Sequence, residues 1–330
     1  MGRDAGLDAA KGALILLVLA GHLVWPVPWP HGPDGVMPPA GQAQMALYGW
    51  IYLFHMPMFA MVSGVLSRAG YSWGLVRSVA GRLLLPYVVF GAIQAATLLA
   101  LGEAARPLWG LYGLWYLLSL AWWRLLLPAF VHLPRPMLWA VALAVGAGWL
   151  GWIGMPLSLS RTCTLFPFFL AGHLLRGERA HLPRLFTPAA AVAVLALCAG
   201  LCWLAAPANV HVLLYGNQPY QVRDLSPWVG PLVRLGRLGL GFAAGLAFLS
   251  LMPSGRGVLG RLGERSLYVY ILHAALLPLY RAAPWLWEPL NAVPVLGVLA
   301  GAVASGFLLA RASRLGWVRR LVEPLPGRRC

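Results

Sequence analysis

Charged side chains are scarce in this chain of 330 residues. Asp, Glu, Lys and Arg together make up 10% of the residues, and only nine of them are acidic. A soluble globular protein has about 25% charged residues. Hydrophobic residues reach 60%, with a mean hydropathy of +0.73. This composition excludes an ordinary soluble protein and predicts an all-α polytopic integral membrane protein.

Several recognisable motifs are also missing. The sequence has no Walker loop, no G-x-G-x-x-G fingerprint, no H-E-x-x-H and no Cys/His metal spacing, so no metal is expected. The four cysteines form no disulfide framework. The arginines are dispersed between apolar stretches, which argues against nucleic acid as a partner. Proton-coupled transporters usually contain intramembrane carboxylates, and the scarcity of acidic residues argues mildly against that class.

Long apolar stretches account for most of the chain. A crossing needs about 20 mostly apolar residues, which predicts about ten transmembrane helices in a single membrane-embedded domain, 1–330. The first stretch lacks a convincing cleavage site and is expected to be a retained signal-anchor. The predicted spans are 12–30, 45–67, 83–102, 108–130, 136–154, 162–176, 186–206, 229–252, 264–281 and 292–311.

The basic residues test the orientation of these spans. If both termini are cytoplasmic, 19 of the 25 Lys and Arg residues lie on the inner side and six on the outer side. Cytoplasmic loops carry an excess of positive charge. The distribution therefore predicts cytoplasmic termini.

Lys11 and His22 stand on one face of the first predicted helix. They are eleven residues apart, about three helical turns and roughly 16 Å. Lys11 is the single lysine. Its structural interpretation is a snorkelling anchor at the membrane edge that pairs with Asp8. His22 has three readings: a structural hydrogen-bonding group, a general base with an unperturbed pKa of about 6.5, or a covalent carrier of a transferred group.

Further polar residues accompany the later spans. His55 lies beside Pro57, whose missing N–H frees a carbonyl for a site or a neighbouring helix. Arg68, Arg77 and Arg82 cluster before the third span, where they either set the topology or bind phosphates. Arg161 and His273 lie near short spans and suggest a polar interior, although a structural role explains either equally well.

Six segments then carry a family resemblance. The first holds Arg3-Asp4, Leu7-Asp8, Lys11-Gly12 and Gly21-His22, and the others follow in the expected order at 51–64, 82–87, 114–118, 161–172 and 262–273. Together they resemble the integral-membrane acyltransferase 3 family, most closely its fucose 4-O-acetylase-like branch. The resemblance covers nearly the whole chain.

The resemblance implies a membrane O-acyltransferase of the bacterial inner membrane. The expected reaction transfers an acyl group, with acetyl expected, from cytosolic acyl-CoA (acetyl-CoA) to a hydroxyl of an envelope glycan or lipid-linked sugar. The implied catalytic residues are His22, Lys11 and His55, where Lys11 replaces the commoner arginine of related members. Arg82 and Arg77 are implied to bind acetyl-CoA, and the pocket candidates are Arg161, His273, Ser63, Trp115 and Tyr116.

Two other functions stay open from the sequence. A transporter or flippase for an envelope precursor would need a similar polar interior without acyl chemistry. A membrane scaffold would need neither histidine. No motif encodes the acceptor, the length of the acyl group, the choice between base and carrier for His22, or the oligomeric state.

Overall fold

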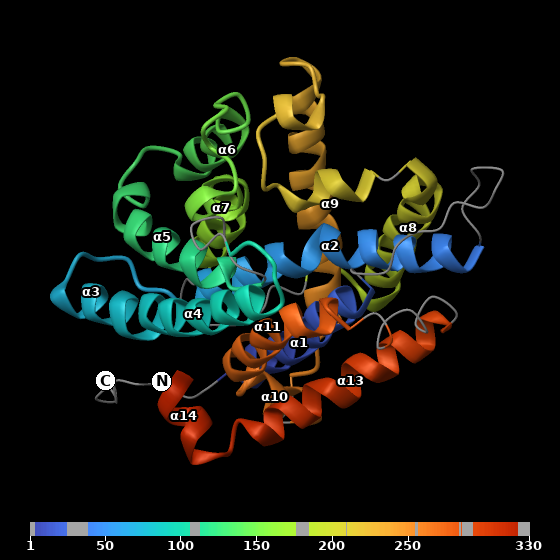
Figure 1. Cartoon of the computed structure of the whole chain (residues 1–330). Helices are drawn as coiled ribbons and strands as arrows, with labels where there is room; N and C mark the ends of the chain where they lie inside the picture. The colour runs from blue at the N-terminus through green and yellow to red at the C-terminus, as the bar shows by residue number, and fades with distance from the viewer. Residues whose placement is uncertain are drawn as a thin grey trace.

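Helices make up all of the regular secondary structure in the described part of the chain, which contains no strand (Figure 1). The computed structural model describes residues 4–24, 39–105, 113–175, 185–208, 210–254, 257–283, 285 and 293–322. The α-helices are α1 (Ala5–Val24), α2 (Pro39–Val65), α3 (Trp73–Val79), α4 (Leu85–Ala100), α5 (Trp115–Phe130), α6 (Pro136–Gly146), α7 (Leu159–Leu174), α8 (Pro188–Ala205), α9 (Val229–Ser250), α10 (Val258–Gly263), α11 (Ser266–Arg281), α13 (Val295–Ala312) and α14 (Gly316–Val322).

Six of the described helical segments are long and apolar enough to cross a membrane. They are Ala5–Val24, Gly41–Val65, Trp73–Ala100, Pro188–Ala208, Val229–Ser250 and Val295–Ala312. They correspond to the first, second, third, seventh, eighth and tenth predicted spans. The other four predicted spans contain α5, α6, α7 and α11, which have 16, 11, 16 and 16 residues. The multi-pass prediction is confirmed, whereas the count of ten and the cytoplasmic termini stay predictions.

The third span starts about ten residues earlier than predicted. Ser72 caps α3 by accepting a hydrogen bond from the Leu75 N–H, and the helix continues through a π-helical turn, η1 (Ala80–Leu84), into α4. Pro86 has no N–H to donate to the Arg82 carbonyl, which explains the wider turn. Arg77 and Arg82 are therefore part of a helix instead of a loop before it.

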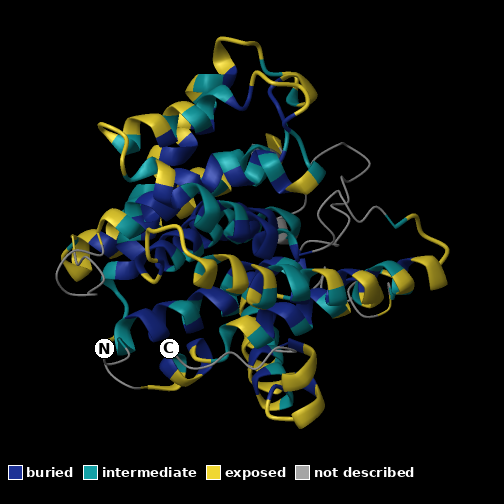
Figure 2. Ribbon diagram, turned by 90° about the vertical axis from the view of Figure 1, so that its left-hand side faces the viewer, coloured by how far each residue is buried: buried dark blue, intermediate teal, exposed yellow. Residues whose placement is uncertain are grey.

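α2 lies at the centre of the bundle and packs against α1, α7, α8 and α9 (Figure 1). Burial is greatest in the middle of the bundle, and exposed residues dominate its outer helices (Figure 2). Gly64 of α2 and Gly172 of α7 let these two backbones approach closely, because a Cβ on either would collide with a carbonyl of the other helix. Small residues permit such crossings in membrane bundles.

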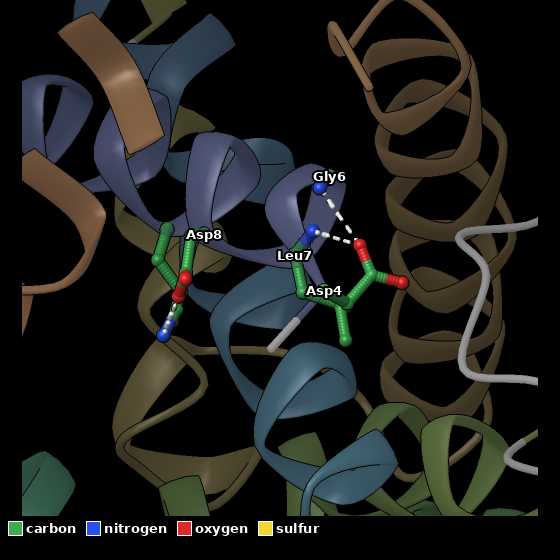
Figure 3. Close-up of polar contacts among 5 residues, drawn as sticks. Asp4, Gly6, Leu7 and Asp8 are labelled. Atoms are coloured by element: carbon green, nitrogen blue, oxygen red, sulfur yellow. Dashed lines mark hydrogen bonds and ion pairs between the residues drawn. The ribbon is translucent and has the colours of Figure 1, made fainter. Parts of the chain in front are cut away.

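The first turn of α1 is anchored by two carboxylates. Asp4 accepts hydrogen bonds from the N–H groups of Gly6 (2.7 Å) and Leu7 (3.1 Å), which satisfies two free donors of the helix start (Figure 3). Asp8 forms an ion pair with Lys11 at 2.6 Å. The predicted pairing of Lys11 with Asp8 is confirmed.

Candidate functional site

A cavity of about 230 Å³ opens between α1, α2, α5, α7, α9 and α11. The segment before α9 closes one side of it, through Leu214, Tyr215 and Asn217. The wall combines histidine, arginine and tyrosine side chains in an otherwise apolar bundle. The lining residues that carry its chemistry are His22, Tyr48, Tyr52, His55, Trp115, Arg161, Tyr215, Asn217, Arg237 and Tyr270.

His22 and His55 reach this cavity from two different helices. His22 lies in the last turn of α1, and His55 lies midway along α2. The Nδ1 of His55 donates to the Ile51 carbonyl at 2.7 Å, because a carbonyl can only accept. In the neutral ring the Nε2 of His55 is then an acceptor, available to a hydroxyl group. His22 and His55 therefore line the same cavity.

The ring of His273 packs against the ring of His22. Their ring centroids are 5.3 Å apart with an interplanar angle of 44°. The Nδ1 of His273 donates to the Val269 carbonyl at 3.2 Å, and its Nε2 has no hydrogen-bond partner among the described residues. His273 is buried and packs against Tyr270, whose ring centroid lies 5.6 Å away. It is therefore placed to orient the His22 ring.

Arg161 projects from the first turn of α7 into the cavity. Its guanidinium carbon lies 4.6 Å from the ring centroid of Trp115, a cation–π contact. Hydroxyl groups hold this end of α7 in place: Ser160 donates to the Gly216 carbonyl at 3.0 Å, and Thr162 donates to Ser119 at 2.9 Å. These contacts position Arg161 on a rigid helix end.

Ser63 and Tyr116 lie beside the cavity but do not line it. Their hydroxyl groups are 2.9 Å apart. The Tyr116 N–H donates to the hydroxyl of Tyr270 at 3.2 Å, and that hydroxyl donates in turn to the Gly113 carbonyl. The backbone N–H of Tyr116 therefore helps to hold Tyr270, which does line the cavity.

Four tyrosines in the wall, Tyr48, Tyr52, Tyr215 and Tyr270, were missing from the predicted site. The Tyr48 and Tyr52 rings stack with centroids 4.1 Å apart, and the Tyr48 hydroxyl is 2.9 Å from that of Tyr215. A signal for two of them exists in the sequence, because Tyr48, Tyr52 and His55 follow a helical 4-3 spacing. Tyr215 has no such signal, since it comes from an irregular segment.

The predicted basic residues lie away from the cavity. The side chains of Arg68, Arg77 and Arg82 are exposed, and Lys11 lies in the second turn of α1, far along the helix from His22. Arg124 of α5 donates to Ser78 at 3.2 Å and is electrostatically coupled to Arg82. Arg77, Arg82 and Arg124 therefore form a basic cluster on α3, η1 and α5. Arg124 lies about 14 Å from Trp115 along α5.

Metal ligands are not grouped in the described part of the chain, where no set of three His, Cys, Asp or Glu residues could hold an ion. Acid–base chemistry by histidine fits the side chains that the cavity does contain.

Comparison with known proteins assigns the family. The sequence model of the acyltransferase domain of the acyltransferase 3 family matches residues 4–311. The chain is also similar to nodulation protein NolL of Sinorhizobium fredii (strain NBRC 101917 / NGR234), with 27% identity over 362 residues that cover 99% of this chain and 93% of the relative. No solved structure matches.

Proposed function

Because the chain belongs to the acyltransferase 3 family and is a multi-pass membrane acyltransferase, we propose that it transfers an acetyl group from cytosolic acetyl-CoA to a hydroxyl of an envelope glycan or lipid-linked sugar. The observation that carries this proposal is the placement of His22 and His55 on one cavity wall. We further propose that the enzyme lies in a bacterial inner membrane with both termini in the cytoplasm and forms a single domain, 1–330.

The reaction at the cavity follows from the two histidines. A neighbouring hydroxyl of the acceptor donates a hydrogen bond to the Nε2 of His55, which orients the sugar and leaves the proton of the reacting hydroxyl to His22. His22 takes the hydroxyl proton while the oxygen attacks the thioester carbonyl carbon. The carbon–sulfur bond breaks, the acetyl ester forms, and the proton passes to the CoA thiolate. A second route has His22 carry the acetyl group covalently before the hydroxyl attacks.

The other residues divide between the two ends of the enzyme. Arg77 and Arg82 bind the phosphates of acetyl-CoA, with Arg124 nearby to add charge. The acyl arm of the donor then extends along α5 toward Trp115. Lys11, paired with Asp8, marks the donor end of α1, and Arg161 faces the reacting groups.

Labelled acetyl-CoA tests the proposal directly. Purified protein in lipid vesicles is mixed with radiolabelled acetyl-CoA and envelope glycans from a deletion strain, and the glycans are analysed by mass spectrometry. We expect glycans heavier by one acetyl group, with label. Vesicles that move glycan across the membrane without ever acetylating it would instead support the flippase reading.

Replacing Arg82 tests the donor end. Arg82→Gln is expected to raise the KM for acetyl-CoA about tenfold or more, because charge-assisted hydrogen bonds to phosphate are lost. The KM for acetyl-pantetheine, a donor without the nucleotide phosphates, should not change. Arg314→Gln, at an exposed arginine beyond α13, is the matched control and should match wild type. An equal rise for both donors would contradict a phosphate role.

A further inference from the structure

Arg237 is a second buried cation in the cavity. It projects from the middle of α9, with only 9% of its surface exposed, and lines the cavity together with Arg161. Its Nη1 makes no hydrogen bond with any described residue. Its positive charge interacts unfavourably with those of Arg234 and Arg161. The cavity therefore holds two guanidinium groups, one of them with an unused donor.

No described carboxylate neutralises these two charges. The acidic residues in the described ranges are Asp4, Asp8, Glu103, Asp224 and Glu264, and none of them lines the cavity. Buried charges are costly unless they are paired, and membrane interiors increase that cost. A ligand that brought its own negative charge would remove the penalty and use the free Nη1 donor.

A smaller cavity that adjoins the main one is also bordered by arginines. Arg237 and Asn217 line both the main cavity and a smaller adjoining one, which is bordered by Arg223 and Arg234. Arg234 spends its donors on the carbonyls of Ala144 (2.9 Å) and Gln218 (3.1 Å). Arg234 therefore has a structural role in the cavity wall. Arg237 is the arginine that still has a donor, Nη1, to offer a ligand.

Gly216 makes room for the Arg237 guanidinium. Its φ is +56°, in the left-handed region that glycine tolerates, and a Cβ at this position would collide with the Arg237 Nη1. The Ser160 and Thr164 hydroxyls both donate to the Gly216 carbonyl, at 3.0 and 3.3 Å. These hydrogen bonds to α7 fix the position of Gly216, and with it the space that the Arg237 guanidinium occupies.

The position of this pair assigns the anion to the acceptor. Arg161 lies twelve residues before His173 on α7, about 18 Å along the helix, and His173 bonds to the Ser67 carbonyl beside Arg68. Arg124, which bonds Ser78 beside Arg77 and interacts electrostatically with Arg82, lies nine residues from the Arg161 contact Trp115, about 14 Å along α5. The arginines proposed for the donor phosphates therefore lie well away from Arg161 along both α7 and α5. A donor whose phosphates occupy that end cannot also place them at Arg237.

We propose that Arg161 and Arg237 bind an oxyanion on the acceptor, so that the enzyme acetylates an acidic sugar in preference to a neutral one. This inference rests on the proposed function and names its acceptor class. Phosphate and carboxylate share the required chemistry, because both accept paired hydrogen bonds from guanidinium groups.

The test compares three probes that differ in charge: glucose 1-phosphate, glucuronic acid and methyl glucoside. Binding to the purified full-length protein is measured by titration calorimetry, and acetyl transfer to each probe is then measured with labelled acetyl-CoA. Wild type should bind at least one charged probe more tightly than methyl glucoside. Arg237→Gln and Arg161→Gln should each weaken that binding roughly 10- to 100-fold, whereas Arg311→Gln, at an exposed position in the last turn of α13, should not.

The outcomes separate the acceptor class from the activity. A preference for glucose 1-phosphate identifies phosphate as the anion, and a preference for glucuronic acid identifies carboxylate. Equal binding of all three probes, or of none, overturns the inference. So does an Arg237→Gln variant that lowers kcat equally on charged and neutral probes with unchanged binding. Charge-selective binding without any acetyl transfer would instead preserve the anion site and refute the proposed function.

Discussion

His22→Ala is expected to lower kcat for acetyl transfer by about 10²- to 10⁴-fold, the range over which a positioned general base contributes. The ring lies in the last turn of α1, in the cavity wall, with His273 5.3 Å behind it. No other described histidine besides His55 lines this cavity. Transfer of label from acetyl-CoA to acceptor, measured at saturating donor, gives the result.

The control for this variant is His132→Ala. His132 is an exposed histidine between α5 and α6, away from the cavity, so its loss should leave the rate unchanged. A correctly folded His22→Ala protein that retains transfer within a few-fold of wild type would remove His22 from the mechanism. Both variants are compared at equal thermal stability in detergent, so that misfolding does not account for a lost rate.

A second measurement separates the two routes through His22. If the imidazole carries the acetyl group, rapid quenching without acceptor should trap label on the wild-type protein and not on His22→Ala. If it acts only as a base, neither protein should retain label. In that case an acceptor with a more acidic hydroxyl should lose less rate in the variant, because it needs less help with deprotonation.

The long helices could be predicted from composition because the bilayer sets their length. Val229–Ser250 follows directly from about 20 mostly apolar residues, whereas α1 starts at Ala5, seven residues before the span predicted at 12–30. The length of a short helix such as α7 could not be predicted in this way, because a helix buried among others does not have to match the thickness of the bilayer. The early start at Trp73 was missed because Arg77 and Arg82 made the segment look like a loop, whereas exposed arginines are compatible with a helix end near water.

The site could be predicted only where one element carried a readable pattern. His22, His55 and Arg161 were identified from the sequence and meet in one cavity. Arg237 falls within the predicted span 229–252, where no pattern marks it as a site residue, because its position depends on the packing of α9. Tyr215 enters the wall through an irregular segment whose path no periodicity describes. Contacts between distant segments decide both positions, and a single sequence does not encode those contacts locally.

Gly64→Val is expected to destabilise the protein by about 3 kcal/mol, near the upper end of the usual cost of overpacking. A Cβ at Gly64 would overlap the Phe169 carbonyl of α7, and a backbone carbonyl cannot move aside as a flexible side chain does. Gly172 meets the Met61 carbonyl in the same way. The two helices would have to separate, and they carry His55 and Arg161, so activity should fall with stability.

Gly200→Val provides the matched control. Gly200 also lies in an apolar helix, α8, but a Cβ there meets no atom within 4 Å. The same side chain is added in both cases, so the difference between the variants isolates the α2–α7 crossing. Unfolding in mixed detergent, followed by tryptophan fluorescence, measures the free energy of unfolding for each. Equal stability of the two variants would mean that the close approach of α2 and α7 does not hold the bundle together, and that His55 and Arg161 are positioned by other contacts.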